Sequence, residues 1–331
     1  YSFLKFYKRG AAHNCLIVKH YDVQRELYGS DDDQDRVFSA GIRTWVKRNK
    51  IKLPDIYLVS EHWFMSMLVR DQWVLVLHME SPESFRNYKI KFTTRDTSEF
   101  HPDIILNLAA MTNVDGCEIN SQLAKSVNVD GVKNLCNGFC GHFIQISTDY
   151  VFDGLSGPYG EADEVNPLSV YGRTKLEAED WLSANHSQTT ILRSNVVYGY
   201  TERTDASFVK WVIDSLSNKK GIAVVDDQWN NPTWIESLTD IIGRLMNEEV
   251  TGLYHYGGYD YMNRFEFAQL IANVFDLDIS LISPISTRDL NQLANRPLKS
   301  GLKTEKIQSA LGIIPNSVET CLQEIRKQLC R

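Results

Sequence analysis

Continuous apolar runs, separated by longer amphipathic stretches, set the pattern of the chain from residue 96 onward. Such runs lie at residues 103–110, 143–146 and 190–193. Runs with little polar alternation are typical of strands buried on both faces of a parallel sheet. Residues 120–140 and 175–184, between these runs, place apolar side chains at helical spacing. Strands that alternate with helical crossovers predict an α/β fold with a doubly wound parallel sheet.

Shorter and more mixed elements follow residue 200. Helical spacing is found at residues 208–216, 235–246, 264–275 and 302–311, and short apolar runs at 222–225 and 252–256. Residues 226–233 are polar and predict a loop. We therefore expect two parts: a sheet domain of residues 96–200, and a smaller C-terminal lobe of residues 201–331 that lies over the strand ends and shapes a substrate pocket.

Residues 1–95 are harder to interpret and form an N-terminal segment of unclear fold. Apolar runs at residues 15–18, 56–59 and 73–78 predict strands, and residues 38–46 or 63–69 fit a helix. A Rossmann-like dinucleotide site normally has a glycine-rich turn between its first strand and helix. The first hundred residues contain only Gly10, Gly29 and Gly41, none at GxxG spacing. The first βαβ unit is therefore predicted to be atypical or missing.

The composition excludes several classes of protein. A chain of 331 residues exceeds the ~250–300 residues of a single core, so a second lobe is expected. The formal charge of −7 gives no reason to expect a nucleic-acid partner, and no uncharged apolar run is long enough for a membrane span. The six cysteines form no CxxC pair and have no histidine at zinc spacing, so we expect no metal site and a reducing, cytoplasmic location.

The strongest candidate for chemistry lies in residues 143–175. The apolar run ends in the hydroxyls of Ser147 and Thr148, and Tyr171 and Lys175 follow at the start of a predicted helix. Residues four apart share one helix face, so the Lys175 ammonium can lie beside the Tyr171 phenol and lower its pKa toward neutrality. Such a phenol exchanges protons with a carbonyl or alcohol oxygen, which Thr148 can hydrogen-bond. An isolated Tyr and Lys at this spacing also occur by chance on surface helices. The strand end that precedes them is what favours a catalytic role.

Several motifs in a fixed order resemble those of a known family. They are residues 107–115 (NLAAMTNVD), 147–154 (STDYVFDG), 166–168 (NPL), 171–175 (YGRTK), 192–199 (LRSNVVYG), 225–228 (VDDQ), 232–233 (PT) and 296–302 (RPLKSGL). Their order is similar to that of the extended short-chain dehydrogenase/reductases, and within them to the dTDP-4-dehydrorhamnose reductase group. The resemblance covers roughly residues 96–331.

The resemblance implies reduction of a 4-keto sugar nucleotide by NADPH or NADH to the 4-hydroxy sugar. Tyr171 would then donate a proton to the keto oxygen, Lys175 would lower the phenol pKa and hold the nicotinamide ribose, and Thr148 would position the carbonyl. The implied cofactor-binding residues are Ala109, Ala110, Thr112, Ser147, Tyr171 and Lys175. Small alanines after a strand let a flat ring approach the backbone, although tight strand-to-helix packing explains them equally well.

The resemblance also implies a substrate-binding set in and near the smaller lobe. It comprises Asp149, Asn195, Gln228, Thr233 and Arg296. The Arg296 guanidinium has the shape to bind a diphosphate, and a surface ion pair is the alternative. For Asp149 a turn or helix cap is as good an explanation as substrate contact. Many reductases of this group have a tryptophan where this chain has Asn195 and Val196, which leaves the substrate less defined.

Two functional classes stay open because the glycine-rich turn is missing. The chain is either an NAD(P)-dependent reductase acting on CH–OH groups or a catalytically inactive relative that serves as a regulatory or binding subunit. The regulatory subunit of methionine adenosyltransferase resembles the same reductase group. The choice between NADPH and NADH also stays open, as does the oligomeric state, for which a homodimer is one option.

Overall fold

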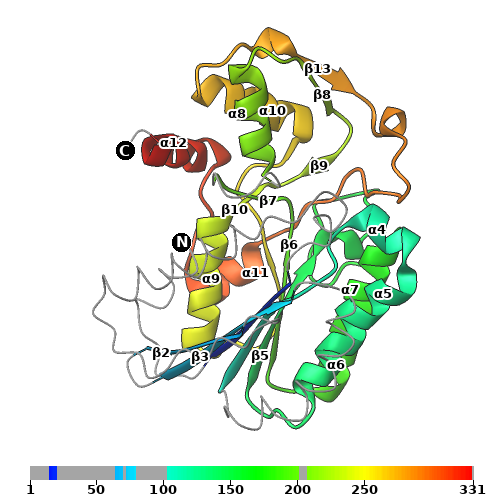
Figure 1. The fold of residues 1–331 in the computed structure, drawn as a ribbon, viewed down its shortest axis with the longest axis vertical. Helices are drawn as coiled ribbons and strands as arrows, with labels where there is room; N and C mark the ends of the chain where they lie inside the picture. The colour runs from blue at the N-terminus through cyan, green and yellow to red at the C-terminus, as the bar shows by residue number, and fades with distance from the viewer. Residues whose placement is uncertain (1–14, 21–63, 70–71, 80–102, 201–206, 330–331) are drawn as a thin grey trace. The chain divides into compact units, whose positions relative to one another are not determined.

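A computed structural model describes residues 15–20, 64–69, 72–79, 103–200 and 207–329 (Figure 1). The chain divides into two compact units. The first unit contains the described residues up to Ile146 together with Glu177–Thr189, and the second contains Ser147–Leu176 and the described residues from Thr190 onward. The predictions for residues 38–46 and 56–59, and Gly10, Gly29 and Gly41, lie outside the described residues.

The first unit is built on five neighbouring strands. These are β1 (Cys15–His20), β2 (Phe64–Val69), β3 (Gln72–Met79), β4 (Ile104–Leu108) and β5 (His142–Thr148), whose last two residues belong to the second unit. They lie in the order β5-β4-β1-β3-β2. All neighbouring pairs are parallel except β2 and β3. The predicted parallel sheet is therefore confirmed.

The position of β1 shows that the first parallel unit is present but atypical. β1 pairs with β3 on one side and with β4 on the other, so the order of the strands reverses between β1 and β4. Ligands of doubly wound sheets bind beyond the carboxyl ends of the strands at such a switch point. The helix fitted to residues 63–69 is wrong for 64–69, because these residues form β2 and pair with β3.

The helices of the first unit follow β4 directly. They are α4 (Val114–Ile119), α5 (Ser121–Lys125), a π-helical turn η2 (Ser126–Asp130) and α6 (Gly131–Cys136). The helix predicted for residues 120–140 is confirmed as far as Cys136. The helix α4 lies before the predicted range, and it forms because the Asn113 side chain accepts the Gly116 N–H at 2.9 Å and caps the helix. Ile105, Leu123 and Phe143 lie in the buried core beneath these helices.

The second unit contains most of the remaining elements. Its helices are α7 (Val170–Asn185, ending in the first unit), α8 (Phe208–Ser217), α9 (Ile235–Asn247), α10 (Arg264–Val274), α11 (Glu305–Leu311) and α12 (Val318–Leu329). Its strands are β6 (Thr189–Ser194) parallel to β11 (Gly252–Tyr256), β8 (Ile222–Val225) parallel to β13 (Ile282–Ile285), and the short β7 (Val197–Tyr198), β9 (Trp229–Asn230), β10 (Thr233–Trp234) and β12 (Met262–Asn263).

Most elements expected after residue 170 are confirmed. The loop expected at residues 226–233 is wrong in part, because β9 and β10 pair there with β12 and β7. The helix expected at residues 302–311 begins only at Glu305. Its first residues instead belong to an extended segment, where Leu302 bridges Tyr159.

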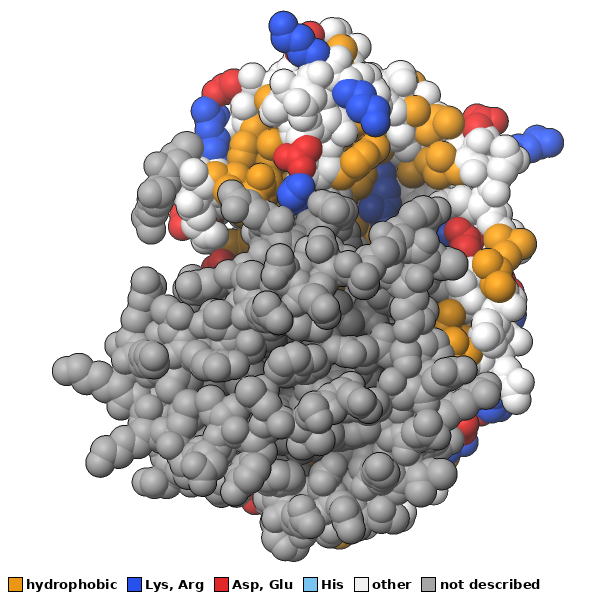
Figure 2. Space-filling model, in the orientation of Figure 1, with side chains coloured by type: hydrophobic (Ala, Val, Ile, Leu, Met, Phe, Trp, Pro, Cys, Tyr) orange, Lys and Arg blue, Asp and Glu red, His pale blue; other side chains and the backbone are white. Residues whose placement is uncertain are grey.

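The visible surface of the described residues mixes apolar and charged side chains (Figure 2). Trp211 on α8, for example, is 40% exposed. Single exposed apolar side chains are normal for a folded protein. Over the ranges that the structure describes, no helix combines the length and apolar character needed to cross a membrane.

A neutral histidine lies in the core of the second unit. His255, on β11, is fully buried, and its Nδ1 lies 3.1 Å from the carbonyl oxygen of Tyr159. This contact makes Nδ1 the protonated nitrogen, so Nε2 accepts from Arg193 at 3.3 Å. Burial and then the charge of Arg193 lower the pKa of His255 to about 3. Protonation would place a second buried cation against the guanidinium.

We expect this histidine to make the fold acid-sensitive. Its pKa is lower in the folded chain than the usual 6.5, so its contribution is complete above pH 6.5 and is lost as the pH falls toward 3. The shift corresponds to about 3–5 kcal/mol of unfolding free energy. Urea unfolding at pH 7, 6, 5 and 4 measures it. In His255→Asn, which keeps a donor and cannot titrate, the unfolding free energy should fall less steeply as the pH is lowered. Equal falls in the variant and the parent would contradict a role for His255 in the acid sensitivity.

Candidate active site

The predicted catalytic hydroxyl lies at the end of a buried strand. Ser147 and Thr148 are the last residues of β5, and their exposed fractions are 5% and 6%. The Thr148 Oγ1 accepts the Tyr150 N–H at 3.2 Å, which caps the short helix η3 (Asp149–Val151). The same hydroxyl donates to the Asp149 carboxylate at 3.2 Å. Its orientation is therefore fixed by two partners.

The first turn of α7 packs on the η3 turn that follows this strand end. Ser169 accepts the Gly172 N–H at 3.2 Å and so caps the helix. A Cβ on Gly172 would lie 2.2 Å from the carbonyl oxygen of Tyr150, which explains why glycine is required here. The Tyr171 ring then lies edge-on to the Tyr150 ring, with centroids 5.7 Å apart. The predicted proton donor is thus held next to the η3 turn.

Lys175 lies one helical turn beyond Tyr171 on α7. Its exposed fraction is 4%, whereas Tyr171 is half-buried. A buried lysine ammonium costs free energy unless it has partners, and such costs concentrate at functional sites. Thr148, at the end of β5, and Tyr171 and Lys175, on α7, all lie in the second unit, and their catalytic roles stay predictions.

Asp149 is buried beside this strand end, and each oxygen of its carboxylate accepts a hydrogen bond. Its exposed fraction is 2%, and the Ser300 hydroxyl donates to it at 2.5 Å. Burial raises the pKa of Asp149, while the hydrogen bonds from Ser300 and Thr148 and the charge of Arg264 oppose that rise. Ser300 is a site residue that the sequence did not reveal. Its place in the motif RPLKSGL was the only signal for it.

The segment that carries Ser300 connects two motifs distant in sequence. We call residues 298–303 the strap. On one side the Lys299 N–H donates to the Gly154 carbonyl at 2.8 Å, and its carbonyl accepts the Gly157 N–H at 2.9 Å. On the other side the strap bridges Trp229. A Cβ on Gly157 would lie 2.4 Å from the Lys299 oxygen, so this close approach needs glycine.

Asn195 and Thr233 form a buried network with Asn231. The Thr233 hydroxyl donates to the Asn195 Oδ1 at 3.2 Å, and the Asn195 Nδ2 donates to the Asn231 Oδ1 at 2.8 Å. Val196, next in the chain, has a φ of +38°, which is unusual for a β-branched residue. Its carbonyl accepts the Thr233 N–H at 3.1 Å. The network thus holds the backbone beyond β6, and substrate contact by Asn195 and Thr233 stays a prediction.

Gln228 and Arg296, the other predicted substrate residues, make local contacts. The Gln228 Nε2 donates to the Thr287 Oγ1 at 3.0 Å, and Thr287 also binds the Asp227 carboxylate. Arg296 donates to the Ala294 carbonyl at 2.9 Å. Gln228 lies next to Trp229 and Arg296 lies just before the strap, so both adjoin the motifs that meet at Ser300.

The predicted cofactor residues that follow β4 lie in the first unit. The Ala109 N–H donates to the Asn107 Oδ1 at 3.0 Å, which turns the chain at the end of the strand. Asn128, in the π-helical turn, accepts the Met111 N–H at 2.7 Å and donates to the Met111 carbonyl at 3.3 Å. Thr112 is exposed. Contact of Ala109, Ala110 and Thr112 with a nicotinamide cofactor stays a prediction.

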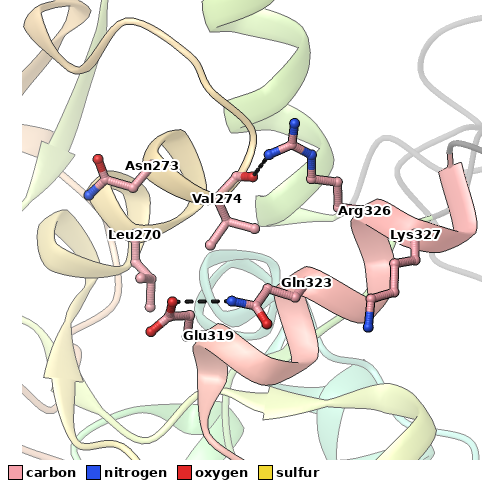
Figure 3. Close-up of a pocket in the computed structure, with 7 residues that line it drawn as sticks. All are labelled: Leu270, Asn273, Val274, Glu319, Gln323, Arg326 and Lys327. Carbon is pink, nitrogen blue, oxygen red and sulfur yellow. Dashed lines mark hydrogen bonds between the residues drawn. The ribbon is translucent and has the colours of Figure 1, made fainter.

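A hollow of about 710 Å³ lies elsewhere, between α10 and α12 (Figure 3). It is lined by Leu270, Asn273, Val274, Glu319, Gln323, Arg326 and Lys327. Arg326 donates there to the Val274 carbonyl at the end of α10, and Gln323 donates to the Glu319 carboxylate (Figure 3). No predicted site residue lines this hollow.

Comparison with known proteins assigns the family. The model described as RmlD substrate binding domain matches residues 82–330. A dTDP-4-dehydrorhamnose reductase of Aggregatibacter actinomycetemcomitans is 34% identical over 242 residues, which are 69% of this chain and 81% of that protein. Methionine adenosyltransferase 2 subunit beta of Bos taurus is 34% identical over 227 residues, which are 65% of this chain and 66% of that protein.

A solved structure extends the comparison to the cofactor. The dTDP-4-dehydrorhamnose reductase of Bacillus anthracis in complex with NADP is 25% identical and has a TM-score of 0.66, over 76% of this chain and 90% of that one. The oxidoreductase class and the nicotinamide cofactor predicted from the sequence are confirmed at the level of the family. The chain belongs to the RmlD substrate binding domain family, within the extended short-chain dehydrogenase/reductases.

Proposed function

We propose that this chain is an NAD(P)H-dependent reductase of a 4-keto sugar nucleotide, similar to dTDP-4-dehydrorhamnose. The observation that carries the proposal is the close packing of α7 on the η3 turn directly after β5. Gly172 lets the first turn of α7 lie against the Tyr150 backbone, and the Tyr171 ring in that turn contacts the Tyr150 ring. The N–H of Tyr150 in turn donates to the Thr148 hydroxyl. A reductase of this type needs a proton donor at a fixed strand end.

The chain's own residues would act on the substrate oxygen. Tyr171 donates the proton that turns the keto oxygen into a hydroxyl, and Lys175 stabilises the phenolate that remains. Thr148 hydrogen-bonds the same oxygen and orients the carbonyl. The nicotinamide cofactor, when bound, supplies the hydride. Exclusion of water by the buried strand end strengthens each of these interactions.

The residues proposed to hold the cofactor lie at the switch point of the sheet. Ala109 and Ala110 follow β4, whose neighbour on the other side of the reversal is β1. Their small side chains leave the backbone accessible to a ribose and a flat ring. Thr112 adds an exposed hydroxyl. Ser147 and Lys175 are the other residues predicted to contact the cofactor.

The residues proposed to hold the sugar nucleotide lie around the strap. Arg296 would bind the diphosphate, because a guanidinium presents paired donors to phosphate oxygens. Gln228, Asn195 and Thr233 shape the pocket from the other segments, and the Trp229 ring, 5.7 Å from Tyr261, offers an aromatic face. Both oxygens of Asp149 have protein partners, and contact of this carboxylate with the sugar stays a prediction.

NADPH is expected to bind the purified chain saturably. The residues proposed to hold the nicotinamide follow the carboxyl end of β4, so titration followed by NADPH fluorescence or calorimetry should give a dissociation constant of about 1–100 μM. Absence of binding up to millimolar NADPH would contradict the reductase proposal. NADH, titrated in parallel, decides which cofactor is preferred.

A pair of variants tests where the cofactor binds. Ala110→Phe places a bulky ring at the strand end and is expected to weaken NADPH binding at least about tenfold. Ile119→Phe, at a residue that is 78% exposed in the same unit, is the matched control and should bind as the parent does. Equal affinity of the two variants would show that the cofactor does not lie against Ala110.

A regulatory subunit is the second candidate function. The relative named methionine adenosyltransferase 2 subunit beta is as identical to this chain as the reductase is, and no GxxG pair occurs in the first hundred residues. The two candidate functions differ in whether the chain oxidises NADPH when the keto sugar is present. Oxidation of NADPH by dTDP-4-keto-6-deoxy sugar supports the reductase, whereas tight NADPH binding without turnover supports the subunit.

A further inference from the structure

The Asp149 carboxylate connects the catalytic threonine to the strap. Its Oδ1 accepts the Thr148 hydroxyl at 3.2 Å and its Oδ2 accepts the Ser300 hydroxyl at 2.5 Å. The exposed fractions of the three side chains are 6%, 2% and 3% in sequence order. Two neutral donors therefore serve one buried carboxylate, and one of them is the proposed substrate-binding hydroxyl.

Ser300 is held rigidly by the backbone around it. Its N–H donates to the Trp229 carbonyl at 3.0 Å. Its own carbonyl lies so close to Gly157 that a Cβ there would be 2.3 Å away. Because the strap is fixed on both sides, the Ser300 side chain keeps its place beside Asp149, which accepts its hydroxyl at 2.5 Å, while the Trp229 carbonyl at 3.4 Å is a weaker second acceptor.

The arrangement is expensive for stability alone. A buried carboxylate is usually less favourable than an apolar residue of the same size, even with good partners. Burial raises the pKa of Asp149, and the Ser300 hydrogen bond is the largest influence that opposes it. Arg264 is the cation that acts on it from α10. Groups of this kind concentrate where chemistry needs them.

The Thr148 hydroxyl has a single proton, and in this structure it donates that proton in a hydrogen bond to Asp149. Its oxygen meanwhile accepts the Tyr150 N–H. To donate to a substrate carbonyl, Thr148 must release Asp149. The carboxylate then loses one hydrogen bond and keeps the one from Ser300. Without Ser300 the Asp149 carboxylate would then have no hydroxyl donor, so breaking the Thr148 hydrogen bond would cost more free energy.

We propose that Asp149 and Ser300 are positioning residues. They orient the Thr148 hydroxyl and let it turn to the substrate oxygen at a low cost in free energy. The inference rests on the proposed reductase function, and it makes the strap part of the catalytic assembly. Asp149 and Ser300 act through Thr148 and do not touch the reacting atoms.

The kinetic test compares Ser300→Ala, Asp149→Asn and the double variant. Ser300→Ala is expected to lower kcat about tenfold and to change the KM for the sugar nucleotide less than about threefold. Since both residues act through one contact, Ser300→Ala should add little to Asp149→Asn in a double-mutant cycle. Ser215→Ala on α8, also a buried serine, is the matched control and should retain full activity. Losses that multiply, or a change confined to KM, would overturn the proposal.

A second measurement does not depend on turnover. The Thr148 methyl resonance of threonine-labelled protein, assigned with Thr148→Ser, reports the orientation of the side chain. It should shift in Ser300→Ala and Asp149→Asn and stay unchanged in Ser215→Ala. An unshifted resonance overturns the positioning role even if the reductase is active, and a shifted one supports it even if the sugar nucleotide tested is not the substrate. Ser300→Cys, with a weaker donor of similar size, gives the same comparison should Ser300→Ala not fold.

Discussion

Replacing Tyr171 by Phe is expected to lower kcat by about 10³-fold while leaving the dissociation constant for NADPH within about threefold. The substitution removes only the phenol oxygen. The ring remains, so its edge-on contact with Tyr150 and the first turn of α7 are preserved. The loss therefore reports proton donation and not a displaced helix. Steady-state reduction of the keto sugar, with NADPH titrated separately, measures both quantities.

A phenol elsewhere in the same unit gives the control for this experiment. Tyr259 is 68% exposed, and Tyr259→Phe should have the kinetics of the parent. If Tyr171→Phe loses cofactor affinity in proportion to turnover, Tyr171 serves binding and the assigned role is refuted. If it retains turnover, another group donates the proton.

The part of the site that was predicted from the sequence depends on neighbours in the chain. Tyr171 and Lys175 are four apart, and Thr148 ends an apolar run, so local spacing alone was enough to predict their roles. Strands with a short apolar run and clear boundaries were equally accessible, as β8 and β11 show, since both match the expected residues. The α4 helix was missed, although Asn113 followed by Asp115 is a local helix-start signal.

What escaped prediction depends on distant partners. Residues 64–69 form a strand because β3 pairs with them, whereas their apolar run alone fits either element. The strand β9 is two residues long and exists because β12 lies opposite it. The bond between Asp149 and Ser300 spans 151 positions, and no local pattern encodes it. Candidate site residues could be predicted where they are near neighbours in the chain. They could not be predicted where the contact comes from the distant strap.

The second large effect is expected at Asn231, whose side chain joins three segments. Its Oδ1 accepts the Leu302 N–H at 2.9 Å and the Asn195 Nδ2 at 2.8 Å. Its Nδ2 donates to the carbonyls of Gly258 at 3.1 Å and Leu302 at 3.0 Å. All four hydrogen-bonding positions of the amide are used, and the residue is 5% exposed.

Asn231→Asp is expected to lower the unfolding free energy of the second unit by about 3–5 kcal/mol. The aspartate has the same shape, but it replaces two donors by an oxygen that faces the carbonyls of Gly258 and Leu302. It also buries a charge without a partner cation among these contacts. Urea unfolding at pH 7 measures the loss. Asn273→Asp adds the same charge on the exposed side of α10 and should change stability by less than about 0.5 kcal/mol.

The pH dependence of the variant identifies the cause. An aspartate without donors has a raised pKa in the folded state, because burial disfavours its charged form. Its protonation is therefore favoured by folding, so the penalty is smaller below the unfolded pKa of about 4 and grows as the pH rises. The stability difference between Asn231→Asp and the parent should narrow between pH 7 and pH 4.5. A difference that stays constant would mean that the amide donors, and not the buried charge, account for the whole loss, and a difference near zero would show that Asn231 does not hold the strap.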